Sequence, residues 1–469
     1  MSNEGTTVGQ RWVLALTSIG SVMVALDVLV VAAALTTIRA DLGASIEQLE
    51  WTVNAYSLSF AMLLMTAAAL GDRWGRRRTF AAGLALFTLA SVGCALASSV
   101  PWLIAARTVQ GIGAAMVMPL AMGLLGAAFP PERRGWAIGI FSGVTGLAVL
   151  GGPMIGGAVT EGLAWQWIFW INVPVGLVAI PLVLRKIPES RGVVRSLDLG
   201  GSALITLSVL GLVWGVVRGE SAGWASGEVV GSLVLGVLLL LGFLAWENRV
   251  GQPMVPLAFF RERGFSAGNA AAFFLNSALL GAVFFLAQFM QAVLGSGPLK
   301  AGLQLLPWTA TLFLVAPIAG RLVDRYGERP FVVTGLALQG AGMTWIALIA
   351  EPGMRYSEFV LPLIVAGCGV SMAMPATQSA AIGSLPRESV GIASGIFGMM
   401  RQLGGVAGVA VAAAVFASAG GYQSFSTGFT RAMVVSGVLS LAGALAGLGI
   451  TARRSTGEVK VPQAVGEMR

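Results

Sequence analysis

Three ionisable side chains lie inside long apolar segments, where a charge is costly and usually serves a function. Asp27 occurs in MVALDVLVVAAAL, Arg107 in LIAARTVQGIGAAM, and Arg401 in a third apolar segment. A carboxyl in a low-dielectric environment favours its neutral form, whereas a nearby Arg favours the carboxylate. A carboxyl balanced between these effects can exchange a proton near neutral pH, and the chain has no His to do so instead. Asp27 and Arg107 are therefore our candidate proton-coupling residues.

Both residues also have a structural interpretation that the sequence leaves open. Asp27 could form an ion pair with an Arg that only stabilises the fold. Arg107 lies near the start of its apolar segment, so its guanidinium could extend to the outer membrane interface. These alternatives compete directly with a role in coupling.

The composition indicates the solvent in which these side chains lie. The chain has 469 residues, of which 56% are hydrophobic and 11% are charged, and its mean hydropathy is +0.83. A soluble domain has about a quarter charged residues, so most of this chain is expected to lie in a bilayer. That composition excludes a soluble enzyme and a nucleic-acid-binding protein, despite the net charge of +8.

Catalytic and cofactor chemistry is not expected either. The absence of His excludes a zinc site built on imidazole and a His general base. Cys94 and Cys368 both lie in apolar segments, which argues against a disulfide framework. No polar catalytic constellation stands out at either membrane face. We therefore expect no enzyme activity, no metal and no cofactor.

The apolar segments predict fourteen membrane-spanning helices, because a helix needs about 20 apolar residues to cross a bilayer. The segments are roughly 12–33, 50–70, 79–98, 102–127, 135–158, 167–184, 198–217, 229–246, 266–294, 302–320, 331–350, 358–382, 390–418 and 431–450. Basic loop residues set the orientation of such a chain. By this assignment 22 of the 29 Lys and Arg lie on the side of both termini. We expect a multi-pass protein of the bacterial inner (cell) membrane with both termini in the cytoplasm.

A loop motif occurs twice, as ALGDRWGRRR after the second segment and as GRLVDRYGER after the tenth. The residues that carry it are Asp72, Arg73, Gly75 and Arg76 in the first copy and Asp324, Arg325 and Gly327 in the second. Gly permits a tight turn between antiparallel helices, and the Arg residues hold the loop at the headgroups. An internal repeat in a chain with many spans is typical of alternating-access transporters.

The repeat also predicts the domain organisation. We expect an all-α membrane protein with a six-helix bundle over residues 1–190 and a second over 251–452. Two additional helices would lie within 191–250, and 453–469 would be a cytoplasmic tail.

A Gly-rich segment, GLAVLGGPMIGG, lies in the fifth apolar segment. Its Gly residues let helices approach closely, and its Pro bends the helix. We assign the motif to Gly152, Pro153, Gly156 and Gly157. Packing alone would also explain these residues.

Together these segments resemble the major facilitator superfamily, and within it the fourteen-span drug:proton antiporters, over roughly residues 10–450. DRWGRRR is similar to the superfamily's cytoplasmic loop motif, and GGPMIGG is similar to the fifth-span motif of exporters. ARTVQGIGAA is similar to the fourth-span motif, whose Arg maps to Arg107 and is linked to proton transfer. LDVLVVAAAL resembles the first-span motif, whose Asp maps to Asp27.

The resemblance implies a major facilitator fold in which two six-helix bundles rock about a central site. Proton entry at Asp27 from outside would drive export of an amphipathic drug or antibiotic natural product. We expect a monomer whose partners are this small substrate, the proton and membrane lipid, with no nucleic acid. The alternative is an importer or uniporter of a small metabolite with the same fold.

Candidate cavity residues are polar or aromatic side chains of the apolar segments, although packing or lipid contact is the favoured alternative for a single Phe. They are Asn54, Tyr56, Gln110, Phe274, Gln288, Gln291 and Arg401. By this assignment the spans hold one acid and two Arg, unless Glu161 or another loop acid reaches inward. Because a buried dication needs more negative charge than this, we expect neutral, zwitterionic, anionic or monocationic substrates.

Overall fold

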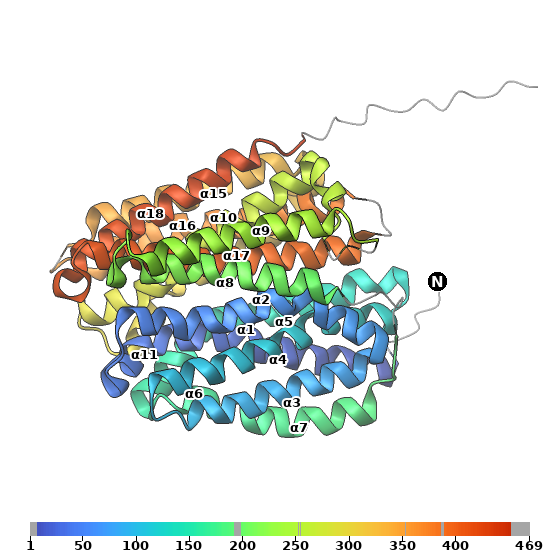
Figure 1. Ribbon diagram of the computed structural model, residues 1–469. Coiled ribbons are helices and arrows are strands. Elements are labelled where there is room, and N and C mark those ends of the chain that lie inside the picture. Colours follow the sequence, from blue (N-terminus) through green and yellow to red (C-terminus); the bar gives the residue numbers. More distant parts are fainter. Residues whose placement is uncertain are drawn as a thin grey trace, which may run out of the picture.

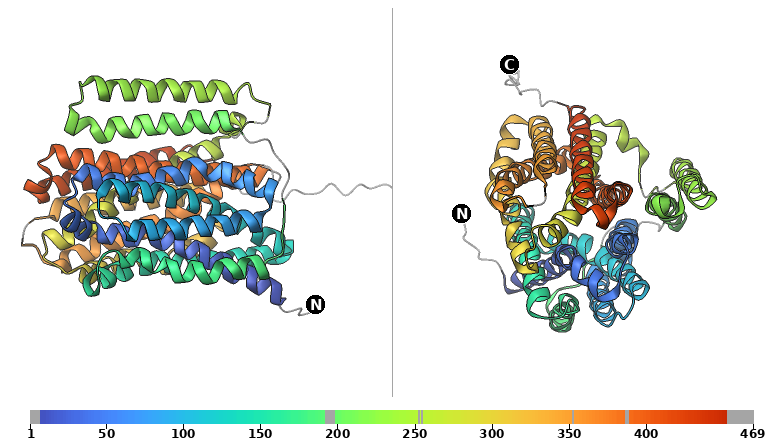
Figure 2. Two further views of the ribbon diagram at one scale, coloured as in Figure 1. Left: turned by 60° about the horizontal axis from the view of Figure 1, so that its bottom comes forward. Right: turned by 90° about the vertical axis from the view of Figure 1, so that its left-hand side faces the viewer.

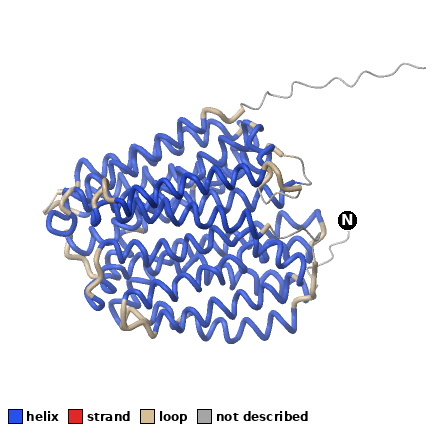
Figure 3. Tube along the Cα trace, viewed as in Figure 1, coloured by secondary structure: helices blue, strands red, loops and turns tan. Residues whose placement is uncertain are grey.

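Every secondary-structure element described in the computed structural model is helical (Figures 1 and 3). The structure describes residues 7–191, 198–251, 253, 255–351, 353–385 and 389–451. Within these ranges, fourteen helices are long and apolar enough to cross a membrane, which confirms the number of predicted spans. The expected tail at 453–469 lies outside the described residues.

The helices before the predicted insertion run back and forth along one axis (Figure 1). They are α1 (Val8–Leu42), α2 (Ile46–Trp74), α3 (Arg76–Ala95), α4 (Val100–Ala128), α5 (Pro131–Gly162), α6 (Trp167–Trp170) and α7 (Asn172–Lys186). We refer to α1–α7 as the first half. The next two helices, α8 (Leu199–Ala222) and α9 (Gly227–Glu247), pack on each other.

The remaining helices form the second half. They are η1 (Leu257–Arg261), α10 (Arg263–Ala292), α11 (Pro298–Gln304), α12 (Leu306–Thr309), α13 (Thr311–Leu314), α14 (Ala316–Tyr326), α15 (Glu328–Ile349), α16 (Tyr356–Gly383), α17 (Val390–Ser418), η3 (Gly421–Ser424) and α18 (Phe425–Gly447). The pair α8–α9 lies to one side of the bundle (Figure 2), where α8 contacts α2 of the first half and α17 of the second.

Both described chain ends lie at the same end of the bundle, since an even number of long helices separates them. We call this end the terminal face and the opposite end the distal face. Helix α2 begins at the distal face and ends at the terminal face, whereas α17 runs in the reverse direction. The two halves meet mainly where α2 packs on α17 and where α5 packs on α11.

Helix α1 extends beyond the predicted segment 12–33 at both ends. It starts in polar sequence because Thr7 and Gln10 form a capping box, which satisfies backbone N–H groups at the helix start. It ends at Gly43, whose φ of 63° is the left-handed conformation that glycine adopts without strain. Hydropathy alone follows the apolar core of such a helix and misses its capped ends.

The tenth span departs from a single helix over 302–320. It is divided into α11, α12, α13 and α14. Pro298, Pro307 and Pro317 lie in the first turns of α11, α12 and α14. Proline has no N–H and clashes with the preceding turn, so each one favours a new helical start.

Candidate functional site

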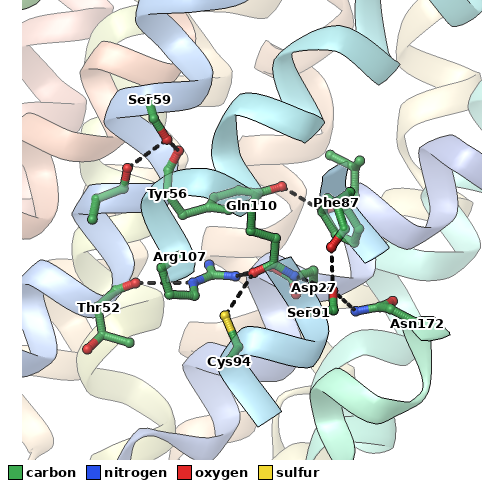
Figure 4. Close-up of polar contacts among 12 residues, drawn as sticks. Asp27, Thr52, Tyr56, Ser59, Phe87, Ser91, Cys94, Arg107, Gln110 and Asn172 are labelled. Atoms are coloured by element: carbon green, nitrogen blue, oxygen red, sulfur yellow. Dashed lines mark hydrogen bonds and ion pairs between the residues drawn. The ribbon is translucent and has the colours of Figure 1, made fainter. Parts of the chain in front are cut away.

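Asp27 and Arg107 form an ion pair in the interior of the first half (Figure 4). Asp27 lies midway along α1 and Arg107 lies two turns into α4, and their exposed fractions are 2% and 1%. Arg107 Nη1 donates a hydrogen bond to Asp27 Oδ2. The guanidinium therefore does not extend to the membrane interface, whereas a purely structural ion pair remains compatible with this geometry.

Gln110 joins the two charged groups to a third helix. Its Nε2 donates to Asp27 Oδ1 and to Ser91 Oγ of α3, each at 2.9 Å. Its Oε1 accepts a hydrogen bond of 2.6 Å from Arg107 Nη1. Gln110, expected in the cavity wall, thus belongs to the hydrogen-bond network of Asp27 and Arg107.

Helix α2 encloses the guanidinium on its remaining sides. Arg107 Nε donates to the Thr52 carbonyl at 3.2 Å, and its Cζ lies 4.2 Å from the centre of the Tyr56 ring. The Tyr56 hydroxyl donates to the Val24 carbonyl at 3.4 Å. A cation on an aromatic face with several acceptors is well compensated for its loss of water.

Sequence analysis missed Ser91, Cys94 and Asn172 as parts of this site. Cys94 Sγ lies 3.6 Å from Gln110 Oε1, and Asn172 Nδ2 lies 3.4 Å from Ser91 Oγ. Ser91 and Cys94 are three residues apart, so they share one face of α3. That spacing was available from the sequence, but no charged residue drew attention to it.

We call the two copies of the loop motif the first and second signature loops. The first signature loop, between α2 and α3, contacts other parts of the first half. Arg76 Nε contacts Asp72 Oδ1 at 2.8 Å, and Arg76 Nη1 donates to the Gly123 carbonyl of α4 at 3.1 Å. Gly75, at φ 111°, makes the turn between α2 and α3, while Arg73 is exposed. Glu189, which follows α7, accepts from the Arg77 backbone N–H at 2.9 Å.

The second signature loop repeats the turn but not its side-chain contacts. Gly327, at φ 81°, separates α14 from α15. Arg325 lies with its Cζ 5.3 Å from the Tyr326 ring centre. Asp324 belongs to α14, but its side chain lies outside what the structure describes. Glu328 at the start of α15 accepts from Ser379 Oγ of α16 at 3.0 Å.

The Gly–Pro motif of α5 lies where the two halves meet. Side chains added at Gly152 or Gly156 would collide with Leu29 or Val30 of α1. A side chain at Gly157 would collide with the backbone of α11 at Pro298 and Leu299. Pro153 is buried within α5, and its carbonyl lies against Gly302 of α11.

Polar side chains from both halves close the distal face. Gln291 of α10 donates through Nε2 to the Ala33 carbonyl of α1 at 3.2 Å, and its Oε1 accepts from Thr36. Gln288, one turn earlier on α10, accepts from the Tyr422 hydroxyl. Both glutamines were expected to line a cavity: Gln291 instead joins the two halves at this end, whereas Gln288 contacts η3 within the second half.

The other cavity candidates divide into three environments. Phe274 lies against Gly443 of α18 and makes an edge-to-face contact with Phe273, so it packs within the second half. Asn54 of α2 is fully buried, and neither atom of its amide has a hydrogen-bond partner. Arg401 of α17 is half-buried, and no ion pair involves it among the described residues.

The count of one enclosed acid was wrong. Glu50 on α2 and Glu247 at the end of α9 are each 3% exposed, so they are as enclosed as Asp27. Both lie at the edges of the predicted segments 50–70 and 229–246, where carboxylates normally reach water. Glu161 does not reach the centre: it is exposed, and its Oε2 accepts from the Leu299 N–H at 2.9 Å.

A fourteen-helix bundle with two matching helix–turn–helix loops and an enclosed ion pair has the construction of a membrane transporter. The family model of the Major Facilitator Superfamily matches residues 17–297 and 269–466. The chain belongs to this superfamily, as the motif resemblance predicted.

Similar proteins are known from actinobacteria. The tetracenomycin C resistance and export protein of Streptomyces glaucescens is 35% identical over 414 residues, which cover 87% of this chain and 77% of that protein. The methylenomycin A resistance protein of Streptomyces coelicolor is 32% identical and covers 85% of this chain and 84% of the relative.

A solved structure agrees with the fold. A peptide transporter of the POT family, in complex with sulfate, superimposes with a TM-score of 0.70 at 15% identity and covers 96% of this chain and 97% of that one. At that identity the likeness concerns the fold alone.

Proposed function

We propose that this protein is a proton-coupled antiporter that exports amphipathic drugs or antibiotic natural products by alternating access. The enclosed Asp27–Arg107 pair carries the proposal, because it offers one titratable carboxyl held between a cation and an amide. The named activities of the two Streptomyces relatives support export of an antibiotic-like compound.

The proposed cycle uses the membrane potential and the pH gradient. One charge moving through 100 mV releases about 2.3 kcal/mol, and one pH unit contributes about 1.4 kcal/mol. A total of about 200 mV therefore supports roughly a thousandfold substrate gradient for each proton. In this proposal the terminal face is cytoplasmic, the distal face is external, and the chain acts as a monomer in the bacterial inner membrane.

An apolar groove beside the coupling network supports the amphipathic character of the substrate. It lies between α1, α5 and α7, has a volume of about 560 Å³, and is lined by residues that include Ile19, Met23, Val144 and Asn172. Asn172 also contacts Ser91, which is bonded to Gln110. A substrate that touches Asn172 would therefore be linked to Asp27 through Ser91 and Gln110. Pockets of this size with few polar groups suit drug-sized ligands.

Transport into inside-out vesicles tests the proposal against the importer or uniporter alternative. ATP-driven acidification of the vesicle interior should make an exporter accumulate an aromatic polyketide or a lipophilic dye. A proton ionophore should release the accumulated compound. Equilibration without accumulation would instead indicate a uniporter and overturn the proposed coupling.

A further inference from the structure

Glu50 is an enclosed carboxyl at the seam between the halves that the coupling network does not use. It lies just over one turn into α2, near the distal face, and is 3% exposed. Its Oε2 is enclosed without a hydrogen-bond partner. Enclosing an ionised carboxylate in this way is costly, so the arrangement suits the neutral acid.

The groups around Glu50 come from both halves of the protein. Arg39 of α1 lies with its Cζ 3.4 Å from the centre of the Tyr422 ring of η3, and its Nε is enclosed without a partner. Tyr422 follows Gly421, which packs against Ile46, one turn before Glu50 on α2. Glu47, one turn before Glu50, instead contacts Arg218 of α8 at 3.4 Å.

The other helices packed on α2 place their charges elsewhere. Arg107 is the only ionisable residue of α4, and it pairs with Asp27. Arg401 is the only ionisable residue of α17 and lies nearer the terminal face. Asp41 of α1 accepts from Trp165 Nε1 at 2.7 Å. Glu47 lies one turn before Glu50 on α2, and Tyr422 adjoins Gly421, which packs against Ile46 of the same helix.

The segment that carries Tyr422 is part of the distal closure. Gly420 and Gly421 have φ values of 99° and 53°, which turn the chain from α17 toward α18. Gly421 packs against Ile46 at the start of α2, and Tyr422 donates to Gln288 of α10. Glu50, one turn after Ile46, therefore lies next to the contact that joins α2 to the second half.

We infer that Glu50 is a second proton-binding residue of the transport cycle and that it carries its proton while the distal face is closed. This inference rests on the proposed antiport, since it assigns one of that cycle's protons. Loss of the proton leaves a charge enclosed without a full set of partners. Separation of the halves relieves this by admitting water to the carboxylate. Low pH therefore favours the closed distal face, and high pH favours the open one.

The inference is tested by measuring the separation of the distal ends directly. Spin labels are attached at Ala40→Cys on α1 and Thr427→Cys on α18, two exposed positions on opposite halves. Cys94 and Cys368 are replaced by Ser, and Asp27→Asn removes the other central carboxyl. The distance between the two spin labels is then measured by double electron–electron resonance from acidic to alkaline pH. A single titrating group changes the open-to-closed ratio by up to about tenfold per pH unit.

The expected result is a shift to longer distances as the pH rises, which Glu50→Gln abolishes by keeping the short distance throughout. Glu47→Gln is the matched control, because this acid lies on the same helix but contacts α8, and it should leave the shift intact. An unchanged shift in Glu50→Gln, or a shift to shorter distances at high pH in the parent, would overturn the inference. Proton-driven export is measured separately in vesicles that contain the protein with native Asp27. If export occurs but Glu50→Gln leaves the distance shift unchanged, the role of Glu50 is wrong and the proposed antiport stands.

Discussion

Asp27 and Arg107 are held by contacts that an amide could partly reproduce. Asp27 accepts from Arg107 and Gln110, and Arg107 reaches the Thr52 carbonyl as well. Removing one partner of an enclosed ion pair commonly costs 3–5 kcal/mol, roughly, because the other charge is left uncompensated. An Asn at position 27 keeps a carbonyl acceptor for the guanidinium, so it removes the titratable proton with less disturbance than Ala.

We predict that Asp27→Asn retains the fold and abolishes proton-driven export, because an amide does not exchange a proton in this range. Accumulation in acidified inside-out vesicles should fall to the level of vesicles without the protein. Binding of a neutral substrate, measured by quenching of intrinsic Trp fluorescence, should persist. Uphill transport at the parent rate would show that Asp27 is structural and that coupling occurs elsewhere, with Glu50 the first candidate.

Substrate charge should follow the charges at the centre of the protein. Asp27 is already paired, Arg401 has no ion-pair partner among the described residues, and Glu50 lies toward the distal face. A dication near Arg401 would be repelled at low dielectric, whereas an acidic phenol or carboxylate could pair with it. We predict stronger resistance to a monovalent quaternary dye than to a divalent bis-cation of similar size in a pump-deficient host.

The role of Arg401 in substrate selection can be tested with a variant. Replacement of Arg401 by Gln should reduce export of acidic substrates by about tenfold, the loss expected for a charge-assisted hydrogen bond. The same change should spare neutral substrates. Better protection against the dication than against the monocation would contradict the prediction and would point to Glu50 as a substrate-binding acid.

Among single residues, the sequence identified those site residues whose charge interrupts an apolar segment. Asp27 and Arg107 stand out in this way, and the structure brings them together. Glu50 does not stand out, since it lies in IEQLEW, a polar start to α2. Ile46, one turn earlier, packs against Gly421 of η3, which is more than 350 residues away in the chain. Only the tertiary fold shows that contact.

Helix α5 joins the first half to the second through residues that have almost no side chain. Gly152 and Gly156 lie against α1, and Gly157 lies against the backbone of α11. Close backbone approach maximises van der Waals contact between membrane helices, where the hydrophobic effect contributes little. Helix α5 can therefore stay packed on α1 while its contact with α11 opens and closes.

We predict that Gly157→Leu weakens distal closure, because the added side chain would occupy the space of Pro298 and Leu299. Overpacking of this kind costs about 1–3 kcal/mol, which corresponds to a shift of about fivefold to 150-fold in a two-state equilibrium. The distance between labels at Ala40 and Thr427 should lengthen, and export should fall. The matched control is Gly143→Ala on the same helix, where an added Cβ meets nothing within 4 Å. An unchanged distance in Gly157→Leu would assign the motif to packing alone.

Hydropathy located the helices but not their ends or interruptions. The run at 12–33 became α1 (Val8–Leu42) because side-chain capping extends it into polar sequence. The run at 302–320 falls on four short helices, three of which have a proline in their first turn. Capping and proline effects are local and were readable from the sequence, whereas the packing of α11 against Gly157 was not.

The two signature loops show how far the internal repeat extends. Gly75 and Gly327 both adopt positive φ between two consecutive helices, so the turn of the repeat is present in the backbone. The partners differ: Glu189 holds the first loop, and Glu328 contacts α16 beside the second. The backbone turn was predictable from the matching motifs. The partners were not, because they come from segments outside them.

The insertion α8–α9 lies beside the α2–α17 contact rather than between the halves (Figure 2). Arg218 of α8 joins it to Glu47 of α2 at 3.4 Å, and Thr66 Oγ1 of α2 lies 2.8 Å from Ser202 Oγ. This position leaves the Asp27 network and the α5–α11 contact free of the inserted helices.

Orientation in the membrane decides the direction of transport, because the distal closure and Glu50 lie at the end opposite the termini. The bias of Lys and Arg toward the terminal face predicts that this face is cytoplasmic, and the signature loops with Arg73, Arg76 and Arg325 contribute to it.

We predict that a fluorescent reporter fused after residue 460, beyond the described residues, folds in the cytoplasm. An alkaline phosphatase inserted at Gly223, in the distal turn between α8 and α9, should be active in the periplasm. The phosphatase fused after residue 460 is the control and should be inactive. Phosphatase activity of that fusion would show that the terminal face is external. Protons entering through the distal face would then come from the cytoplasm, and the same structure would have to work as an importer.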